Sequence, residues 1–145
     1  MALSAPTGQW WLVPYRPVRM QITDDKIDNA VLKSIGRDVV HLLCAGNVDA
    51  LAARFGYAVA LGRGAATAIR EDLVECLGKV GAISLASNSQ FDCDVKFFAP
   101  NSSNLVAIVE GVVPTLNGGD VLVEIAVTSD GSNRYATLEQ ISVVN

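Results

Sequence analysis

Apolar positions in the first half of the chain recur with the spacing of an α-helix. One unbroken row follows four-residue steps: Ile27, Val31, Ile35, Val39 and Leu43. Apolar side chains at this spacing share one face, so the row predicts an amphipathic helix over residues 24–45. Thr23 is the expected N-cap, and Gly46 suits the position after the last turn because glycine enters the left-handed region freely. Gly36, in the middle of the helix, predicts a close packing contact.

Two further helices are expected before the sequence changes character. Asn47 and Gly56 bracket a short helix over residues 48–55. A longer helix is predicted over residues 65–80, with apolar residues on one side and charged residues on the other. The segment 57–61 between them fits either extended chain or helix.

From Phe91 onward the apolar period changes from that of a helix to two, which is typical of half-buried β-strands. The first strand begins at Phe91 and points Cys93, Val95 and Phe97 to the buried side. Three more strands follow, over residues 105–113, 121–128 and 135–144. Gly111 is the expected site of a bulge. Short turns separate these strands, so the pattern predicts an antiparallel meander.

The first 22 residues form an arm that contains three prolines and both tryptophans. Proline disfavours helix, so the arm is expected to be extended, with a short strand over residues 18–22. Trp10 and Trp11 are expected to pack either on the parent domain or on a partner chain. The whole chain, 1–145, is therefore interpreted as a single α+β domain. It comprises an arm (1–22), N-terminal helices (23–82) and a curved four-stranded, or five-stranded, antiparallel sheet (83–145).

Composition narrows the class of protein. Half of the residues are hydrophobic and 18% are charged, which argues against disorder. No apolar run reaches the length of a membrane span, and no signal-peptide pattern opens the chain, so a cytoplasmic location without membrane contact is expected. The three cysteines, Cys44, Cys76 and Cys93, are widely spaced and form no C-x₂₋₄-C pair. They are interpreted as reduced thiols, and no metal or cofactor is expected.

The formal net charge of −4 is distributed unevenly. Residues 1–85 carry nine Lys or Arg and eight Asp or Glu, whereas residues 86–145 carry two and seven. An acidic second half would repel a phosphate backbone, so nucleic acid is not an expected partner.

Five residues are candidates for lining a ligand pocket, although none is assigned a catalytic role. His41, the only histidine, and Asp38 lie on the flank of the first helix. Tyr57, Tyr135 and Trp11 are aromatic residues with a polar tip, which suit a pocket as well as a core or an interface. Asp92 and Asp94 are interpreted as a solvated strand face, and Gly62-Arg63-Gly64 as a helix-entry turn that is only a weak candidate anion site.

Two segments resemble the NTF2-like or cystatin-like superfamily. They are the helix through Val39-Val40-His41-Leu42-Leu43 and the following Ala45-Gly46-Asn47-Val48-Asp49-Ala50-Leu51. The second is similar to the G-[ND]-h-D-A-L opening of many members, and the later strands extend the resemblance over residues 24–144. The resemblance implies a sheet curled into a cone around a long helix, often within a homodimer.

The hypothesis that follows is a non-catalytic, dimeric binding protein for a small apolar ligand or a protein partner. The alternative is a small isomerase or dehydratase-like enzyme, with Asp38, His41 or Tyr57 as acid or base inside the cone. A purely structural dimer is a third interpretation. Fold analogy alone does not decide among them.

Overall fold

The computed structural model describes residues 18–86 and 93–144 and has an α+β architecture. The helical elements are α1 (Asn29–Cys44), α2 (Val48–Phe55), the 3₁₀ turn η2 (Ala58–Ala60) and α3 (Ala65–Lys79). The strands are β1 (Met20–Ile22), β2 (Cys93–Phe97), β3 (Leu105–Val113), β4 (Val121–Ser129) and β5 (Arg134–Val143). Three α-helices thus precede the main part of the sheet, as the change of period predicts.

The five strands form one antiparallel sheet in the order β1-β5-β4-β3-β2. The strands β2 to β5 follow one another as a meander, which confirms the antiparallel prediction. The fifth strand is β1, which pairs with the beginning of β5. It falls within the short strand expected over residues 18–22.

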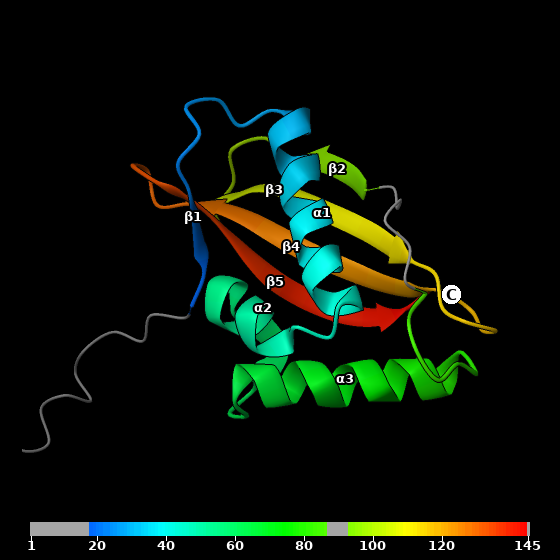
Figure 1. The fold of residues 1–145 in the computed structure, drawn as a ribbon. Coiled ribbons are helices and arrows are strands. Elements are labelled where there is room, and N and C mark those ends of the chain that lie inside the picture. Colours follow the sequence, from blue (N-terminus) through cyan, green and yellow to red (C-terminus); the bar gives the residue numbers. More distant parts are fainter. Residues whose placement is uncertain (1–17, 87–92, 145) are drawn as a thin grey trace, which may run out of the picture.

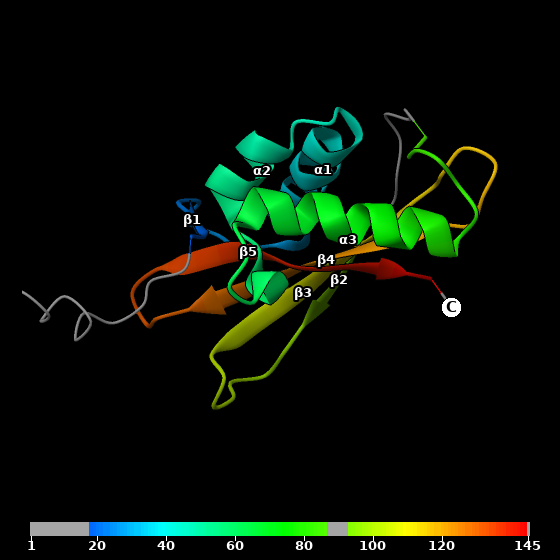
Figure 2. The same cartoon turned by 90° about the horizontal axis from the view of Figure 1, so that it is seen from below.

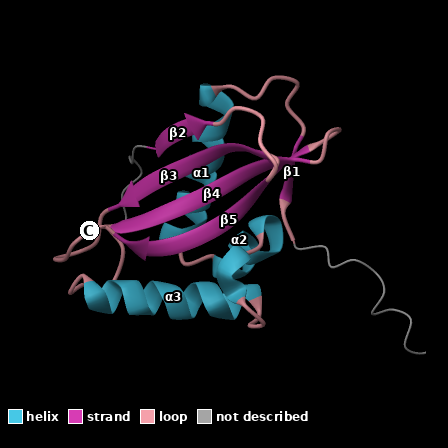
Figure 3. Cartoon of the chain, turned by 180° about the vertical axis from the view of Figure 1, so that it is seen from behind, coloured by secondary structure: helices cyan, strands magenta, loops and turns pink. Residues whose placement is uncertain are grey.

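The helices are distributed unevenly around the sheet. Figures 1 and 2 show α1 and α2 on one face, with α3 running alongside β5 at the edge. β1 protects the first part of that edge, and α3 lies along the later part, where Cys76 Sγ is 3.7 Å from the carbonyl oxygen of Ile141. Covering a strand edge in this way prevents it from pairing with another chain. Seen from behind, the opposite face of the sheet carries no α-helix (Figure 3). The 3₁₀ turn η2 lies next to β5, where Ala58 and Ala60 line a cavity with Thr137.

The core lies between α1, α2 and the covered face of the sheet. The helix α1 buries Leu32, Ile35, Val39, Val40 and Leu43. The strands meet them with alternate residues, including Val109, Val123, Ile125 and Leu138. A Cβ added at Gly36 would lie 2.7 Å from Cys93 Sγ, so this glycine lets α1 approach β2 closely. The predicted packing contact at Gly36 is confirmed.

The first helix begins five residues later than predicted. Its N-cap is Asp28, whose side chain accepts a 3.0 Å hydrogen bond from the backbone N–H of Val31. The predicted cap at Thr23 was wrong because Ile27 continues the apolar spacing although it precedes the helix. Asp28 competes with it as an equally good cap. The other helix bounds agree with prediction, and Gly46 has the expected positive φ of 73°.

Two predictions about the strands were wrong. The register of β3 against β4 is continuous through Gly111, and its irregularity lies between Leu105 and Ala107. Gly111 instead lies where α1 packs on the sheet. A Cβ added at this position would be 3.5 Å from both Cys93 Sγ and Val40 Cγ2. Phe97 is 48% exposed rather than buried, at the far end of the edge strand β2. The predicted start of this strand at Phe91 lies outside the described residues.

Candidate functional site

The uncovered face of the sheet, called the outer face below, carries the side chains that point away from α1. In β3, Gly111 contacts α1 and Val109 is buried, so the residues between and beyond them point to the outer face. The register places Asp94 opposite Glu110 and Glu110 opposite Glu124. These three carboxylates, called the acidic row, cross β2, β3 and β4, and Gln140 continues the line on β5.

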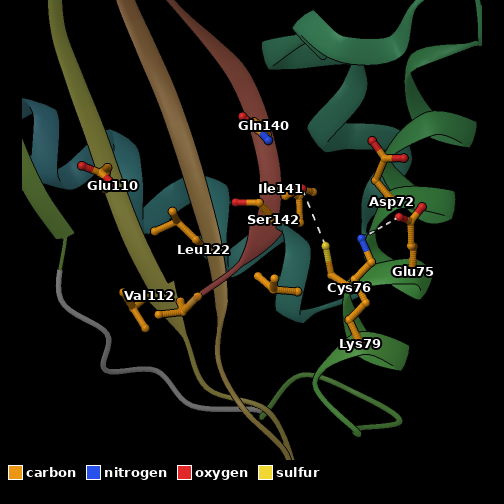
Figure 4. Close-up of a pocket in the computed structure, with 12 residues that line it drawn as sticks. Asp72, Glu75, Cys76, Lys79, Glu110, Val112, Leu122, Gln140, Ile141 and Ser142 are labelled. Atoms are coloured by element: carbon orange, nitrogen blue, oxygen red, sulfur yellow. Dashed lines mark hydrogen bonds and ion pairs between the residues drawn. The ribbon is translucent and has the colours of Figure 1, made fainter.

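Between the outer face and α3 lies an open groove of about 720 Å³ (Figure 4). One wall is formed by side chains of α3: Asp72, Glu75, Cys76 and Lys79. The other wall and the floor come from the outer face and the end of β5: Glu110, Val112, Leu122, Gln140, Ile141, Ser142, Val143 and Val144. Glu110 therefore belongs both to the acidic row and to the groove.

The two sides of the groove differ in how their charges are compensated. On α3, Lys79 Nζ lies 2.9 Å from Glu75 Oε1, and Asp72 is held by Arg63. Within the described residues, no ion pair involves the acidic row. Burial raises the pKa of Glu124, and the charges of Glu110 and Glu139 raise it further. The sheet side of the groove is thus a region of uncompensated negative charge.

Apolar side chains accompany this charge. Val112 is 42% exposed and lies directly opposite the partly buried Leu122, two residues along the strands from the pair Glu110 and Glu124. Val144, 44% exposed, extends the apolar surface at the end of the groove. Exposed apolar side chains next to charged ones are typical of surfaces that bind another molecule.

A polar cluster of Tyr57, Arg63 and Asp72 attaches the loop between α2 and α3 to the helix α3. The Tyr57 hydroxyl donates a 2.6 Å hydrogen bond to Asp72 Oδ2, and Arg63 Nη1 donates one of 2.9 Å to Asp72 Oδ1. Arg63 also donates to the carbonyl oxygens of Val59 and Ala60. The guanidinium is thus occupied with closing the loop, consistent with the interpretation of this segment as a helix-entry turn.

The same hydrogen bonds determine the protonation of the cluster. Burial, and then the hydrogen bond to Asp72, raise the pKa of Tyr57. The hydrogen bond from Arg63 is the main cause that lowers the pKa of Asp72. A protonated tyrosine bound to an ionised aspartate is a stable arrangement at neutral pH, and these bonds fix the loop to α3.

The structure does not bring the four described pocket candidates together around one cavity. Tyr57 is buried and lines a cavity of about 420 Å³ together with Val18, Arg63 and Thr137. Asp38 lines a different cavity of about 480 Å³ beside β1, and its Oδ2 lies 3.6 Å from Arg54 Nη2. The described candidates therefore do not converge on one site.

His41 and Tyr135 line neither of these two cavities. His41 is exposed in the last turn of α1. Tyr135, on the outer face of β5, lies under the guanidinium of Arg19, 3.7 Å from its ring centroid, and donates a hydrogen bond to Asp130. Trp11 lies outside the described residues.

The sequence predicted that Asp94 lies on a solvated strand face. It did not indicate that Glu110 and Glu124 are aligned with Asp94 across the sheet. Both glutamates stand out as single charges within long apolar strands, at Leu105–Val113 and Val121–Ser129. That signal marks them as unusual, but the register that aligns them is visible only in the sheet.

The described carboxylates, histidine and cysteines form no group of three that could hold a metal ion. No helix in the described part of the chain combines the length and apolar character that crossing a membrane requires. Comparison with models of known protein families, with curated proteins and with solved structures found no match.

Proposed function

We propose that this chain is a non-catalytic binding protein of the NTF2-like kind, whose binding surface is the outer face of the sheet together with the groove beside α3. The observation that carries the proposal is the combination on one uncovered face of a 720 Å³ groove, exposed apolar side chains and an uncompensated acidic row. A large open surface of this type suits a protein partner better than a small ligand.

Side chains fill the interior of the fold, which favours binding of a partner to the outer face. The space between α1 and the sheet is occupied by side chains such as Leu32, Val39, Val109 and Ile125, all at most 1% exposed. Among the described residues, the buried side chains are apolar apart from the Tyr57 hydroxyl and the thiols of Cys76 and Cys93. The alternative, an isomerase or dehydratase-like enzyme, would need an acid or base facing substrate, whereas the one hydroxyl of the described core, that of Tyr57, is bound to Asp72.

The homodimer remains a prediction of the resemblance. Direct stacking of two outer faces would bring two acidic rows together, which is unfavourable when the charges have no counter-ions. Self-association through this face would therefore require the two copies to be displaced from one another.

Site-specific photo-crosslinking tests the proposed surface. A photoreactive amino acid at position 112 is expected to yield a defined protein adduct in the cells that make this protein, and Leu122→Thr should abolish that adduct. Position 74 on α3 is the matched control, because Val74 is also apolar and 69% exposed but does not line the groove. Equal crosslinking from both positions, or none from position 112, would contradict the proposal. A small molecule retained in native mass spectrometry would favour a cavity ligand instead.

A further inference from the structure

We infer that the partner of the outer face is a basic, amphipathic protein segment, in which Lys or Arg side chains alternate with apolar ones. This inference rests on the proposed function and specifies its partner. It follows from the arrangement of charge and apolar surface on the sheet.

The acidic row carries an electrostatic cost within the sheet. Like charges directly opposite one another in a sheet destabilise it, and here two such pairs follow each other, Asp94 with Glu110 and Glu110 with Glu124. Lys96, on β2 two residues from Asp94, lies over the ring of Phe98 at 5.5 Å from its centroid, and no ion pair joins it or another described cation to the row. The row is therefore left without a counter-charge from the described residues, and a cationic partner would supply one.

The apolar pair and the acidic pair lie at a fixed distance from one another along the strands. The apolar pair Val112 and Leu122 lies two residues along the strands from the acidic pair Glu110 and Glu124. Two residues of a strand span about 7 Å. A partner must therefore present an apolar and a cationic side chain about 7 Å apart, which fits positions i and i+2 of an extended segment or i and i+4 of a helix.

The charge and chemistry of the outer face disfavour other occupants. The described carboxylates do not gather into a metal site. A nucleic acid would be repelled by the row. A second copy of the chain would oppose its own acidic row to this one. A basic segment with apolar side chains satisfies both parts of the surface.

Selection from a random 12-residue peptide library tests this inference without assuming a natural partner. Peptides selected on the wild-type protein should carry net positive charge and apolar residues. Glu110→Gln/Glu124→Gln should weaken their binding by about tenfold, because the variant removes two carboxylates that would pair with cations of the peptide. Binding should also weaken between low and high salt. Asp24→Asn/Asp25→Asn is the matched control, since it removes two carboxylates from an exposed loop and should leave binding unchanged.

The outcomes separate the inference from the proposed function. Neutral or acidic peptides whose binding is lost in Val112→Thr/Leu122→Thr would overturn the basic partner while leaving the outer face as the binding surface. A specific dimer disrupted by the same double variant, with no peptide selected, would do likewise. Peptides that bind all of these variants equally, or the absence of both peptide binding and association, would overturn the inference and the proposed function together.

Discussion

The two faces of this sheet are formed by the same strands but differ in burial and in the charges that they carry. In β4, Val121, Val123, Ile125 and Val127 are buried on the face that α1 and α2 cover. On the outer face between them, Leu122 and Glu124 are only partly buried, whereas the small Ala126 is buried. The inner face is uniformly apolar and closely packed, as stability requires. The outer face places like charges opposite one another, which stability alone disfavours. Departures from stability of this kind are expected where a surface is used for binding.

Truncations within β4 should show the largest difference between the two faces. Ile125→Ala is expected to lower the free energy of unfolding by about 2–5 kcal/mol, because it opens a cavity in the packed core. Leu122→Ala, its control on the outer face, should cost less than about 1 kcal/mol because solvent already reaches this side chain. Urea denaturation followed by circular dichroism measures both. Similar losses for the two variants would mean that another element covers the outer face.

The sequence predicts this inner face well and the outer face poorly, and the reason is physical. Periodicity depends on burial, so residues such as Ile35, Val39 and Val123 mark the inner face without any knowledge of their neighbours. Helix bounds were recovered where Gly46 and Gly56 end an element, and were missed at Thr23 because two capping residues compete. The acidic row depends on which residues of β2, β3 and β4 lie opposite one another. Register is a long-range property, and single glutamates in apolar strands do not reveal it.

The predicted pocket residues illustrate the same limit. His41 and Asp38 were placed correctly on the flank of a helix, but nothing local indicates that Asp38 lies beside Arg54. Tyr57 was recognised as a polar-tipped aromatic residue, whereas its partners Asp72 and Arg63 come from different segments. Chemistry along the chain can be read from residue types, but a site needs distances between elements.

A substitution at the contact between α1 and the inner face should have an effect of intermediate size on stability. Gly36→Ala is expected to cost about 1–3 kcal/mol, because the added methyl group would lie 2.7 Å from Cys93 Sγ and 3.0 Å from Val109 Cγ1. Gly78→Ala, in α3, is the matched control. An added Cβ there has no atom within 4 Å, so the substitution should stabilise the helix by up to about 1 kcal/mol.

A double-mutant cycle identifies the cause of the loss. Gly36→Ala should cost less in a Cys93→Ala background, since the smaller side chain leaves room for the methyl group. Equal stability changes for Gly36→Ala and Gly78→Ala would show that α1 does not approach β2 as closely as the structure indicates.

The smallest expected effect has the opposite sign and concerns the outer face. Glu124→Gln should raise the free energy of unfolding at neutral pH by about 0.2–1 kcal/mol, because it removes a carboxylate that lies directly opposite Glu110. The pKa of Glu124 is raised in the folded protein, so its ionised form is the destabilising one. The advantage of the variant should therefore be largest above this raised pKa and shrink as the pH falls through it and the wild-type carboxylate becomes protonated. Thermal unfolding of both proteins between neutral and acidic pH measures the difference, with Asp25→Asn as a loop control. A variant less stable than wild type at neutral pH would show that the acidic row is compensated within the fold, and would remove the reason to expect a cationic partner.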